Sequence, residues 1–293
     1  MAIYNLGSIN IDHFYRLSHL PAPGETLATD DYSVGLGGKG ANQSAAAAKA
    51  GAKVFHIGAV GPDEGRRAVD RLASWGVDVA NVSRIGTPTG HAIINVDEGA
   101  ENSIVIFPGA NRALGLGEVE LALSGAGPND TLILQNETAH QVEAARIGKL
   151  KGMRVIYSAA PFDAEAVRAV LEYTTILALN AVEAQQLTEA LGVTLDQLPV
   201  PEILVTKGSE GAEWRSLQTG ERASQPAIKV DAVDSTGAGD TFVGYFAAAM
   251  DAGETTARAL RLASAAAALK VTRAGTAEAI PTRAEVDAFL EEQ

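Results

Sequence analysis

The chain has no cysteine among its 293 residues. This excludes disulfide bonds, thiolate nucleophiles and cysteine-ligated metal centres, and it favours a reducing compartment. The five histidines show no i, i+4 pairing and no Gly-x-Ser-x-Gly segment occurs, so metallohydrolase and serine hydrolase chemistry have no support. Lys and Arg do not cluster, and the formal net charge is −13. Because nucleic acids and anionic membranes bind basic faces, we expect neither as a partner.

No apolar run reaches the roughly 18 residues that a membrane-spanning helix needs. Residues 1–5 enter a strand pattern directly, with no basic segment followed by an apolar run, and we therefore expect a cytoplasmic location. The hydrophobic content of 46% suffices for a substantial core. Aromatic residues make up only 5%, which argues against a ligand held by ring stacking.

Strand-like apolar runs alternate with helical patterns along the chain, which predicts an α/β fold with a mostly parallel sheet covered on both faces. Strands of this sheet are expected at residues 3–7, 54–58, 131–135, 154–158, 175–179 and 203–207. Helices are expected at residues 41–50, 64–75, 117–124, 140–150, 164–172, 181–191, 241–252, 256–272 and 283–291.

Two segments interrupt this alternation. Residues 10–36 hold two prolines between short alternating runs, and residues 91–107 predict a hairpin with strands at 92–96 and 103–107 around a turn at 97–100. We expect both to lie outside the main sheet, as segments of about 10–36 and 88–110 inserted in a single domain of residues 1–293. A family resemblance, carried by the two glycine-rich segments below, implies that they form a lid, and a small excursion without motion is the alternative.

The most informative segment is Asp-Ser-Thr-Gly-Ala-Gly-Asp at residues 234–240, just before a long apolar helix. Glycines let an anion approach the backbone, and the unpaired N–H groups at a helix start suit a phosphoryl group. Asp240 is then placed to accept a proton from a hydroxyl that attacks this phosphate. A lone Gly-x-Gly-Asp turn is more often structural, so the argument depends on the whole segment.

A second glycine-rich segment, residues 35–40, satisfies Gly-x-Gly-x-x-Gly and precedes a helix. A dinucleotide site is a weak interpretation, because that motif belongs in the first βα turn with an acidic residue near the end of the next strand. No P-loop motif occurs either. The glycines, with the amide of Asn42 and with Asn10 and Asp12 after the first strand, suit a neutral polyhydroxylated ligand. Asn10 and Asp12 as mere turn formers are the alternative.

Together the two segments resemble the signatures of the ribokinase or PfkB family of carbohydrate kinases. The usual family heptapeptide is Asp-Thr-Thr-Gly-Ala-Gly-Asp, so Ser235 is its only departure here, and residues 37–42 resemble the second signature. The resemblance extends from about residue 3 to residue 290. It implies a ribokinase-like three-layer αβα sandwich with a small β-sheet lid, and an ATP-dependent sugar kinase. In the resemblance Asp240 is the general base, and the backbone of Gly237, Ala238, Gly239 and Asp240 forms an anion hole.

The resemblance also implies where the ligands bind. The sugar residues are Asn10, Asp12, Gly38, Lys39, Gly40, Asn42, Glu137 and Asp240. The ATP residues are Asn180, Glu183, Thr206, Gly208, Gly211, Gly239 and Ser264, with Mg²⁺ accompanying the triphosphate. A monovalent cation, K⁺, is expected at Asp234, Thr236, Lys270, Arg273 and Gly275. Structural alternatives are a capping box for Asn180 and Glu183 and a simple tight turn at 208–211.

The expected reaction is transfer of the ATP γ-phosphoryl group to a primary hydroxyl, with D-ribose giving ribose 5-phosphate. A kinase for a hexose, a keto-deoxy sugar acid or a nucleoside is the alternative, and a sensor that binds sugar without catalysis is a remote one. Departures from the family occur at residues 158–161, Ser264 and Ala279. The lid is also expected to pair with a second copy of the chain in a homodimer.

Overall fold

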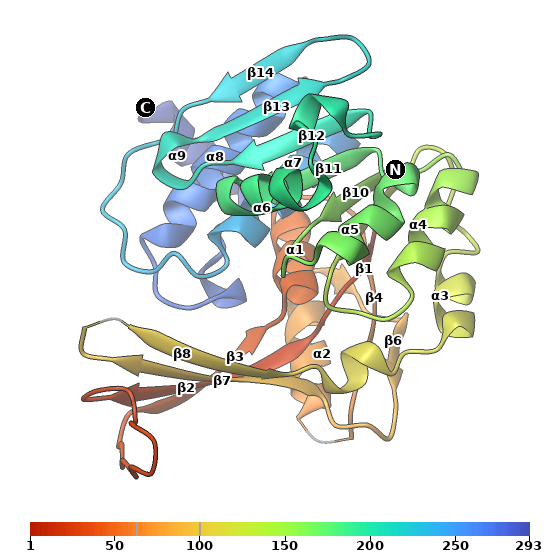
Figure 1. Ribbon diagram of the computed structural model, residues 1–293. Helices are drawn as coiled ribbons and strands as arrows, with labels where there is room; N and C mark the ends of the chain where they lie inside the picture. Colours follow the sequence, from red (N-terminus) through yellow and green to blue (C-terminus); the bar gives the residue numbers. More distant parts are fainter. Residues whose placement is uncertain (63, 100) are drawn as a thin grey trace.

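The computed structural model describes residues 1–62, 64–99 and 101–293, and its main feature is a wide twisted sheet (Figure 1). The strand order is β14-β13-β12-β11-β10-β9-β1-β4-β5, and β6 pairs with β4. From β12 to β5 in this order, neighbouring strands are parallel. β13 pairs in antiparallel fashion with both β12 and β14. The strands are β1 (Ile3–Leu6), β4 (Val54–Val60), β5 (Val77–Asp78), β6 (Val82–Arg84), β9 (Thr131–Gln135), β10 (Arg154–Ser158), β11 (Ile176–Asn180), β12 (Glu202–Thr206), β13 (Ala212–Ser216) and β14 (Arg222–Gln225).

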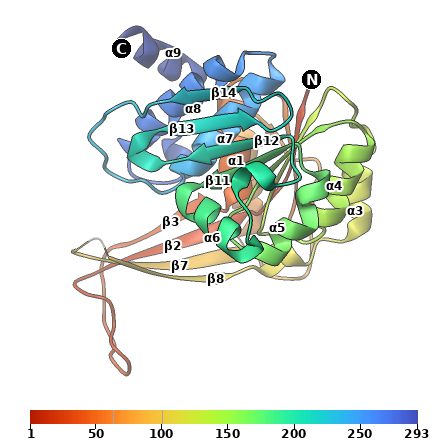
Figure 2. The ribbon, with the colours of Figure 1, turned by 45° about the horizontal axis from the view of Figure 1, so that its top comes forward.

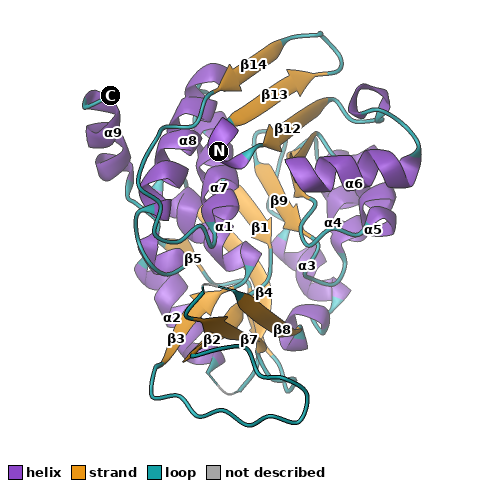
Figure 3. Ribbon diagram, turned by 60° about the vertical axis from the view of Figure 1, so that its left-hand side comes forward, coloured by secondary structure: helices purple, strands orange, loops and turns teal. Residues whose placement is uncertain are grey.

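Helices cover both faces of this sheet, so the predicted three-layer α/β fold is confirmed (Figure 3). Helices α1, α2, α7, α8 and α9 pack on one face and α3 to α6 on the other. Ile133 of β9 belongs to the first layer's core, whereas its neighbours Leu132 and Leu134 belong to the second. Side chains alternate along a strand, so a strand buried on both faces is apolar throughout. The helices are α1 (Lys39–Lys49), α2 (Gly65–Ser74), α3 (Leu116–Ala122), α4 (Gln141–Leu150), α5 (Ala164–Val170), α6 (Ala181–Leu191), α7 (Ala238–Asp251), α8 (Thr256–Val271) and α9 (Arg283–Glu291).

Helices α1 and α7 approach each other closely because small residues line their contact. A Cβ added at Gly244 of α7 would lie 2.6 Å from the backbone oxygen of Gln43 and 2.5 Å from the Cβ of Ala46, both on α1. Alanine and glycine permit such an approach, and the alanine-rich sequence of α1, α7 and α8 is thereby explained. The starts of α1 and α7 consequently lie side by side.

A second sheet of four strands projects from the body as the expected lid (Figure 2). Its order is β3-β2-β7-β8, in which β2 and β7 are parallel and the other pairs antiparallel. The predicted hairpin is present as β7 and β8, and of its turn Ala100 lies outside the described residues. The strands are β2 (Asn10–Leu17), β3 (Tyr32–Gly37), β7 (Gly90–Asp97) and β8 (Asn102–Phe107).

The helices predicted from the sequence are all present, with ends shifted by a few residues. The shift that matters is in α7, which begins at Ala238 rather than at residue 241. Gly237 adopts φ 74°, a left-handed conformation that glycine takes without strain, and this lets the helix begin directly after it. Asp240 therefore lies inside the first turn. Among the described residues, no helix is long and apolar enough to cross a membrane.

Candidate active site

The first turn of α7 presents backbone donors beside a carboxylate. The N–H of Ala238 donates to the Ser235 carbonyl at 3.1 Å, and that of Thr241 donates to the Gly237 carbonyl at 2.9 Å. Within the described residues, the N–H groups of Gly237, Gly239 and Asp240 have no hydrogen-bond acceptor. Ala238, expected to contribute to the anion hole, therefore closes the turn with its N–H. The free donors are the other three, at the positive end of a helix of 14 residues.

The carboxylate of Asp240 is held by two amide side chains from α1. Asn42 Nδ2 donates to Oδ2 at 3.1 Å, and Gln43 Nε2 donates to Oδ1 at 2.9 Å. Both contacts depend on the close approach of α1 and α7. Asn42 was expected here as a sugar ligand, whereas Gln43 was missed by the sequence analysis. The Oδ1 atom of Asn42 is buried without a hydrogen-bond partner in the described part of the chain.

Behind Gln43, hydrogen bonds continue into the sheet. Gln135 Nε2 donates at 2.8 Å both to Gln43 Oε1 and to Asn5 Oδ1, and all three side chains are fully buried. Asn5 Nδ2 donates in turn to Ser44 Oγ at 2.9 Å. A buried network of this kind fixes the orientation of its members, because any rotation leaves a polar group unpaired. Gln43 is thereby held in the orientation that serves Asp240.

The network ends at His56, whose ring lies 2.8 Å from Ser44 Oγ and 3.1 Å from the Gly7 carbonyl oxygen. Burial lowers the pKa of His56 to about 4, although the hydrogen bond to Gly7 opposes this. The ring is therefore neutral at neutral pH, donating to Gly7 and accepting from Ser44. The signal for this network was present in the sequence: Asn5, His56 and Gln135 are polar residues inside strands that are otherwise apolar.

Lys39, the first residue of α1, contributes the positive charge of the site. The negative charge of Asp240 raises the pKa of Lys39 above its ordinary value, burial opposes this, and Glu137 and Glu183 add to it. The Lys39 backbone N–H also donates to Glu137 Oε2 at 3.1 Å. A cleft of about 140 Å³ lies here, at the carboxyl ends of the parallel strands. Its lining residues include Lys39, Asn180, Glu183, Thr206, Gly237, Gly239 and Asp240.

Asn180 and Glu183 form the capping box that was the structural alternative for them. The Asn180 N–H donates to Glu183 Oε2 and the Glu183 N–H to Asn180 Oδ1, both at 2.8 Å. Both residues also line the cleft, so the two interpretations are compatible. Burial raises the pKa of Glu183, while the hydrogen bond from Asn180 and the charge of Lys39 oppose the rise.

On the lid side, β2 brings Asn10 and Asp12 to the start of α1. Asn10 Oδ1 accepts from Asn111 Nδ2 at 2.8 Å, and Asn111 Oδ1 accepts from the Ile9 N–H at 2.9 Å. Asn111, which the sequence analysis missed, therefore orients Asn10. Asp12 is 7% exposed, and its carboxyl group accepts no hydrogen bond from the described residues. Burial, with Glu137 and Glu278 nearby, raises its pKa to about 7.

The glycines of the second segment make room for these groups. A Cβ on Gly37 would lie 2.0 Å from Asp12 Oδ2. Gly38 has φ 90° and faces the Ser8 carbonyl, and a Cβ on Gly40 would lie 2.3 Å from the Gly7 Cα. Ser8 Oγ in turn donates to Glu137 Oε2. The glycines thus let the start of α1 lie directly against the end of β1.

A larger, mostly apolar cavity of about 530 Å³ adjoins the cleft and shares Thr206 and Gly239 with it. Besides Gly239, four residues expected to bind ATP line this cavity: Thr206, Gly208, Gly211 and Ser264. Ser264 Oγ is buried with no hydrogen-bond partner among the described residues. An apolar cavity with an unpaired hydroxyl suits a flat heteroaromatic ring with a polar edge.

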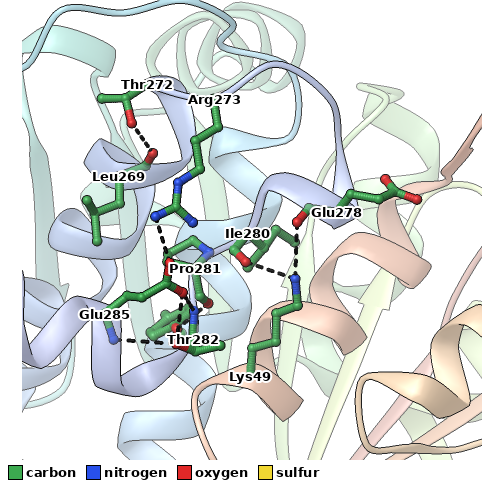
Figure 4. Close-up of polar contacts among 10 residues, drawn as sticks. Lys49, Leu269, Thr272, Arg273, Glu278, Ile280, Pro281, Thr282 and Glu285 are labelled. Carbon is green, nitrogen blue, oxygen red and sulfur yellow. Dashed lines mark hydrogen bonds and ion pairs between the residues drawn. The ribbon is translucent and has the colours of Figure 1, made fainter.

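Of the residues expected to bind a monovalent cation, Asp234 and Thr236 belong to the 234–240 segment. Lys270 lies in the last turn of α8, and Arg273 and Gly275 follow that helix. Asp234 Oδ1 accepts from the Thr236 N–H and Oδ2 from the Gly275 N–H, both at 2.9 Å. Lys270 Nζ donates to the Asp234 carbonyl at 2.8 Å. The Arg273 guanidinium instead donates to Glu285 Oε1 at 2.8 Å, as Figure 4 shows.

Residues 3–283 match the model of the pfkB family carbohydrate kinases. The chain belongs to this family. It is similar to the ribokinase of Haemophilus influenzae, with 36% identity over 304 residues covering 98% of this chain and 97% of the relative. It is also similar to the deoxyribokinase of Salmonella typhi, at 31% identity with 99% of both chains covered.

Among solved structures, the chain is similar to Arabidopsis thaliana ribokinase complexed with ribose and ATP. The TM-score is 0.87 at 30% identity, with 99% of this chain and 98% of the other covered. Family membership and these relatives confirm an ATP-dependent carbohydrate kinase with a ribokinase-like fold.

Proposed function

We propose that this PfkB-family kinase, a single domain of residues 1–293, transfers the γ-phosphoryl group of ATP to the primary hydroxyl of D-ribose, giving ribose 5-phosphate and ADP. The observation that carries the proposal is the geometry of Asp240. Its carboxylate is held by Asn42 and Gln43 within the same helical turn that leaves the N–H groups of Gly237 and Gly239 free. A base and an anion-binding surface thus adjoin, as in-line phosphoryl transfer requires.

In the proposed reaction, Asp240 takes the proton as the sugar oxygen forms its bond to the γ-phosphorus and the bond to the β-phosphate oxygen breaks. The free N–H groups of Gly237, Gly239 and Asp240 stabilise the charge on the transferring oxygens. The Lys39 ammonium adds positive charge beside them. Glu183, which lines the cleft, would hold a bound Mg²⁺, and the ion would neutralise charge on the phosphate oxygens.

The sugar is proposed to bind between the lid and the start of α1. Among the described residues Asp12 has no hydrogen-bond donor and the buried Oδ1 of Asn42 has no partner, so both are available to accept from sugar hydroxyls. Asn10, Glu137 and the backbone of residues 38–40 complete the polar surface. Asp12 and Asn42 Oδ1 need hydrogen-bond donors, and the hydroxyl groups of a neutral polyol supply them.

The adenine ring of ATP is proposed to occupy the cavity of about 530 Å³, with Ser264 Oγ at its polar edge. Thr206, Gly208 and Gly211 border this cavity, and Asn180 lines the adjoining cleft. For the monovalent cation we propose a different arrangement, because the Lys270 ammonium lies among the residues assigned to it.

We further propose that two copies associate through the outer face of the lid. By the strand register, large apolar side chains of β3, β7 and β8 share this face and are exposed to solvent. Such a face is typical of an interaction surface. These residues are Tyr32, Val34, Ile93, Val105 and Phe107. A cytoplasmic location is proposed too, since the reaction consumes ATP and the chain has no cysteine.

The test is ADP release measured across pentoses, 2-deoxyribose, hexoses, a keto-deoxy sugar acid and nucleosides. D-Ribose is expected to give the highest kcat/KM. A preference for 2-deoxyribose would favour the second candidate, which the similarity to a deoxyribokinase supports. In the same assay, Asp240→Asn is expected to bind sugar normally and to lose about 10²–10⁴-fold in kcat. Turnover near the wild-type rate in that variant would remove Asp240 as the base.

A further inference from the structure

Lys270, in the last turn of α8, is a lysine with no solvent exposure at all. Its Nζ donates to the backbone carbonyl of Asp234 at 2.8 Å and lies 3.8 Å from Asp234 Oδ2. Burial lowers the pKa of Lys270, and the charge of Asp234 opposes this. Burying an ammonium group is costly unless a partner compensates, and here the compensation comes from one residue. That residue is the first of the segment that forms the proposed anion hole.

Each of the three oxygen atoms of Asp234 accepts a hydrogen bond. Its two carboxylate oxygens accept from the N–H groups of Thr236 and Gly275, and its carbonyl accepts from Lys270. The N–H groups of Val233 and Asp234 both donate to the Val271 carbonyl, at 2.7 and 3.0 Å. The segment that precedes the anion hole is therefore fixed to the end of α8, with the ammonium at the centre of the junction.

These residues do not fit the exchangeable monovalent cation that the family resemblance implied. An alkali cation needs several oxygen ligands, and each oxygen of Asp234 already uses one of its two lone pairs for a hydrogen bond. The Lys270 charge would also repel a second cation a few ångströms away. The Arg273 guanidinium donates to Glu285 Oε1, and the Arg273 N–H donates to the Lys270 carbonyl at 3.0 Å.

We propose that the Lys270 ammonium is the resident cation of this junction, so that the kinase needs no exchangeable monovalent ion. The tethered charge holds the carbonyl and carboxylate of Asp234, and this orients the peptide groups of residues 235–237 that lead into the anion hole. Lys270 is thus a positioning residue that acts through Asp234. The inference extends the kinase activity and does not depend on which sugar is the acceptor.

Lys49 provides a matched control. Its Nζ donates to the carbonyls of Ala277 and Ile280 at 3.0 and 2.8 Å and approaches that of Glu278 at 3.5 Å (Figure 4). It braces the loop after α8, whose Gly275 N–H donates to Asp234, but Lys49 itself makes no contact with Asp234. A loss of activity caused only by a weakened structure in this region should therefore appear in both Lys270→Ala and Lys49→Met. An effect specific to the cation at Asp234 should appear only in Lys270→Ala.

The experiment measures ADP release by the wild type, Lys270→Ala and Lys49→Met in KCl, NaCl and choline chloride at equal ionic strength. The wild type is expected to have the same kcat in all three salts within about twofold. Lys270→Ala should lose about 10–100-fold in choline chloride, as supporting residues behind a functional group typically do, and should regain activity in KCl. Lys49→Met should show no difference between the salts.

Thermal unfolding of the nucleotide-free proteins gives a second readout that needs no substrate. The Tm of Lys270→Ala should rise in KCl relative to choline chloride, whereas that of the wild type should not. Strong K⁺ activation of the wild type would overturn the proposal. So would a Lys270→Ala variant that is fully active in choline chloride, or one that no cation restores. If this variant does not fold, the salt dependence of the wild type still decides. An inactive wild type with a K⁺-insensitive Tm would instead count against the assigned substrates.

Discussion

The pH dependence of sugar binding should follow the ionisation of Asp12. In the sugar-free protein, burial and the charges of Glu137 and Glu278 raise the pKa of Asp12 to about 7. A sugar hydroxyl donates best to the ionised carboxylate, so the proposed complex selects the deprotonated form. At pH 6 only about one molecule in eleven is ionised, against about ten in eleven at pH 8. The dissociation constant for D-ribose should therefore be about tenfold higher at pH 6, or about 1.4 kcal/mol.

Isothermal titration of D-ribose without nucleotide tests this directly, since chemistry at Asp240 then plays no part. Titrations in buffers of different ionisation enthalpy should also show nearly one proton released per sugar at pH 6 and very few at pH 8. The control is Asp12→Asn, which should bind more weakly and with no pH dependence. An affinity constant within about twofold from pH 6 to pH 8 in the wild type would show that the Asp12 carboxylate does not accept from the sugar.

The same ionisation affects folding in the opposite direction. The pKa of Asp12 is higher in the folded protein, at about 7, than the ordinary value of 3.8. The unfolded chain then binds fewer protons between these pH values, so the free energy of unfolding falls as pH rises from about 4 to 7. The upper limit of this loss is about 4 kcal/mol. Bound sugar should reduce it, because the hydroxyl donors stabilise the carboxylate.

Two substitutions test the groups that support the site. Gly37→Ala places a Cβ 2.0 Å from Asp12 Oδ2, so we expect the KM for sugar to rise about tenfold or more. The control is Gly117→Ala, where no atom lies within 4 Å of the added Cβ, and this variant should behave as wild type. Equal KM values in the two variants would contradict the role of Gly37. Gln43→Leu removes the donor to Asp240 Oδ1, so kcat should fall about 10–100-fold while the dissociation constant for sugar stays unchanged. Loss of sugar binding with an unchanged kcat would argue against a positioning role for Gln43.

The sequence predicted the parallel core of the fold because its main strands are buried on both faces and are mostly apolar. The strands it missed lack that signal. β5 and β6 have two and three residues, β13 alternates between buried and half-buried positions, and β14 is a polar edge strand, Arg-Ala-Ser-Gln, with exposed positions. Such strands form because a neighbour offers free backbone groups, which is a tertiary effect.

Within the site, the sequence pointed to residues whose chemistry and local backbone geometry coincide, and it could not show partners that come from far along the chain. The segment 234–240 carries its helix start, its glycines and its carboxylate within seven residues. The partners of Asp240 on α1 are 197 and 198 residues away, and those of Asn10 are 101 residues away. Lys270 looks like an ordinary basic residue at a helix C-terminus, and only the fold shows that it is buried.

The small residues of α1 and α7 link the packing of the fold to the geometry of the site. Gly244 has no room for a Cβ, because α1 backbone and side-chain atoms lie within 2.6 Å of where it would be. Any larger residue there would push α1 away from α7 and lengthen both amide contacts to Asp240, even though Gly244 is more than a helical turn from the carboxylate. Alanine and glycine content, which in sequence suggests only dense packing, therefore sets the distance between the Asp240 carboxylate and the side chains that hold it. In this kinase the packing of two helices is part of the geometry of the proposed active site.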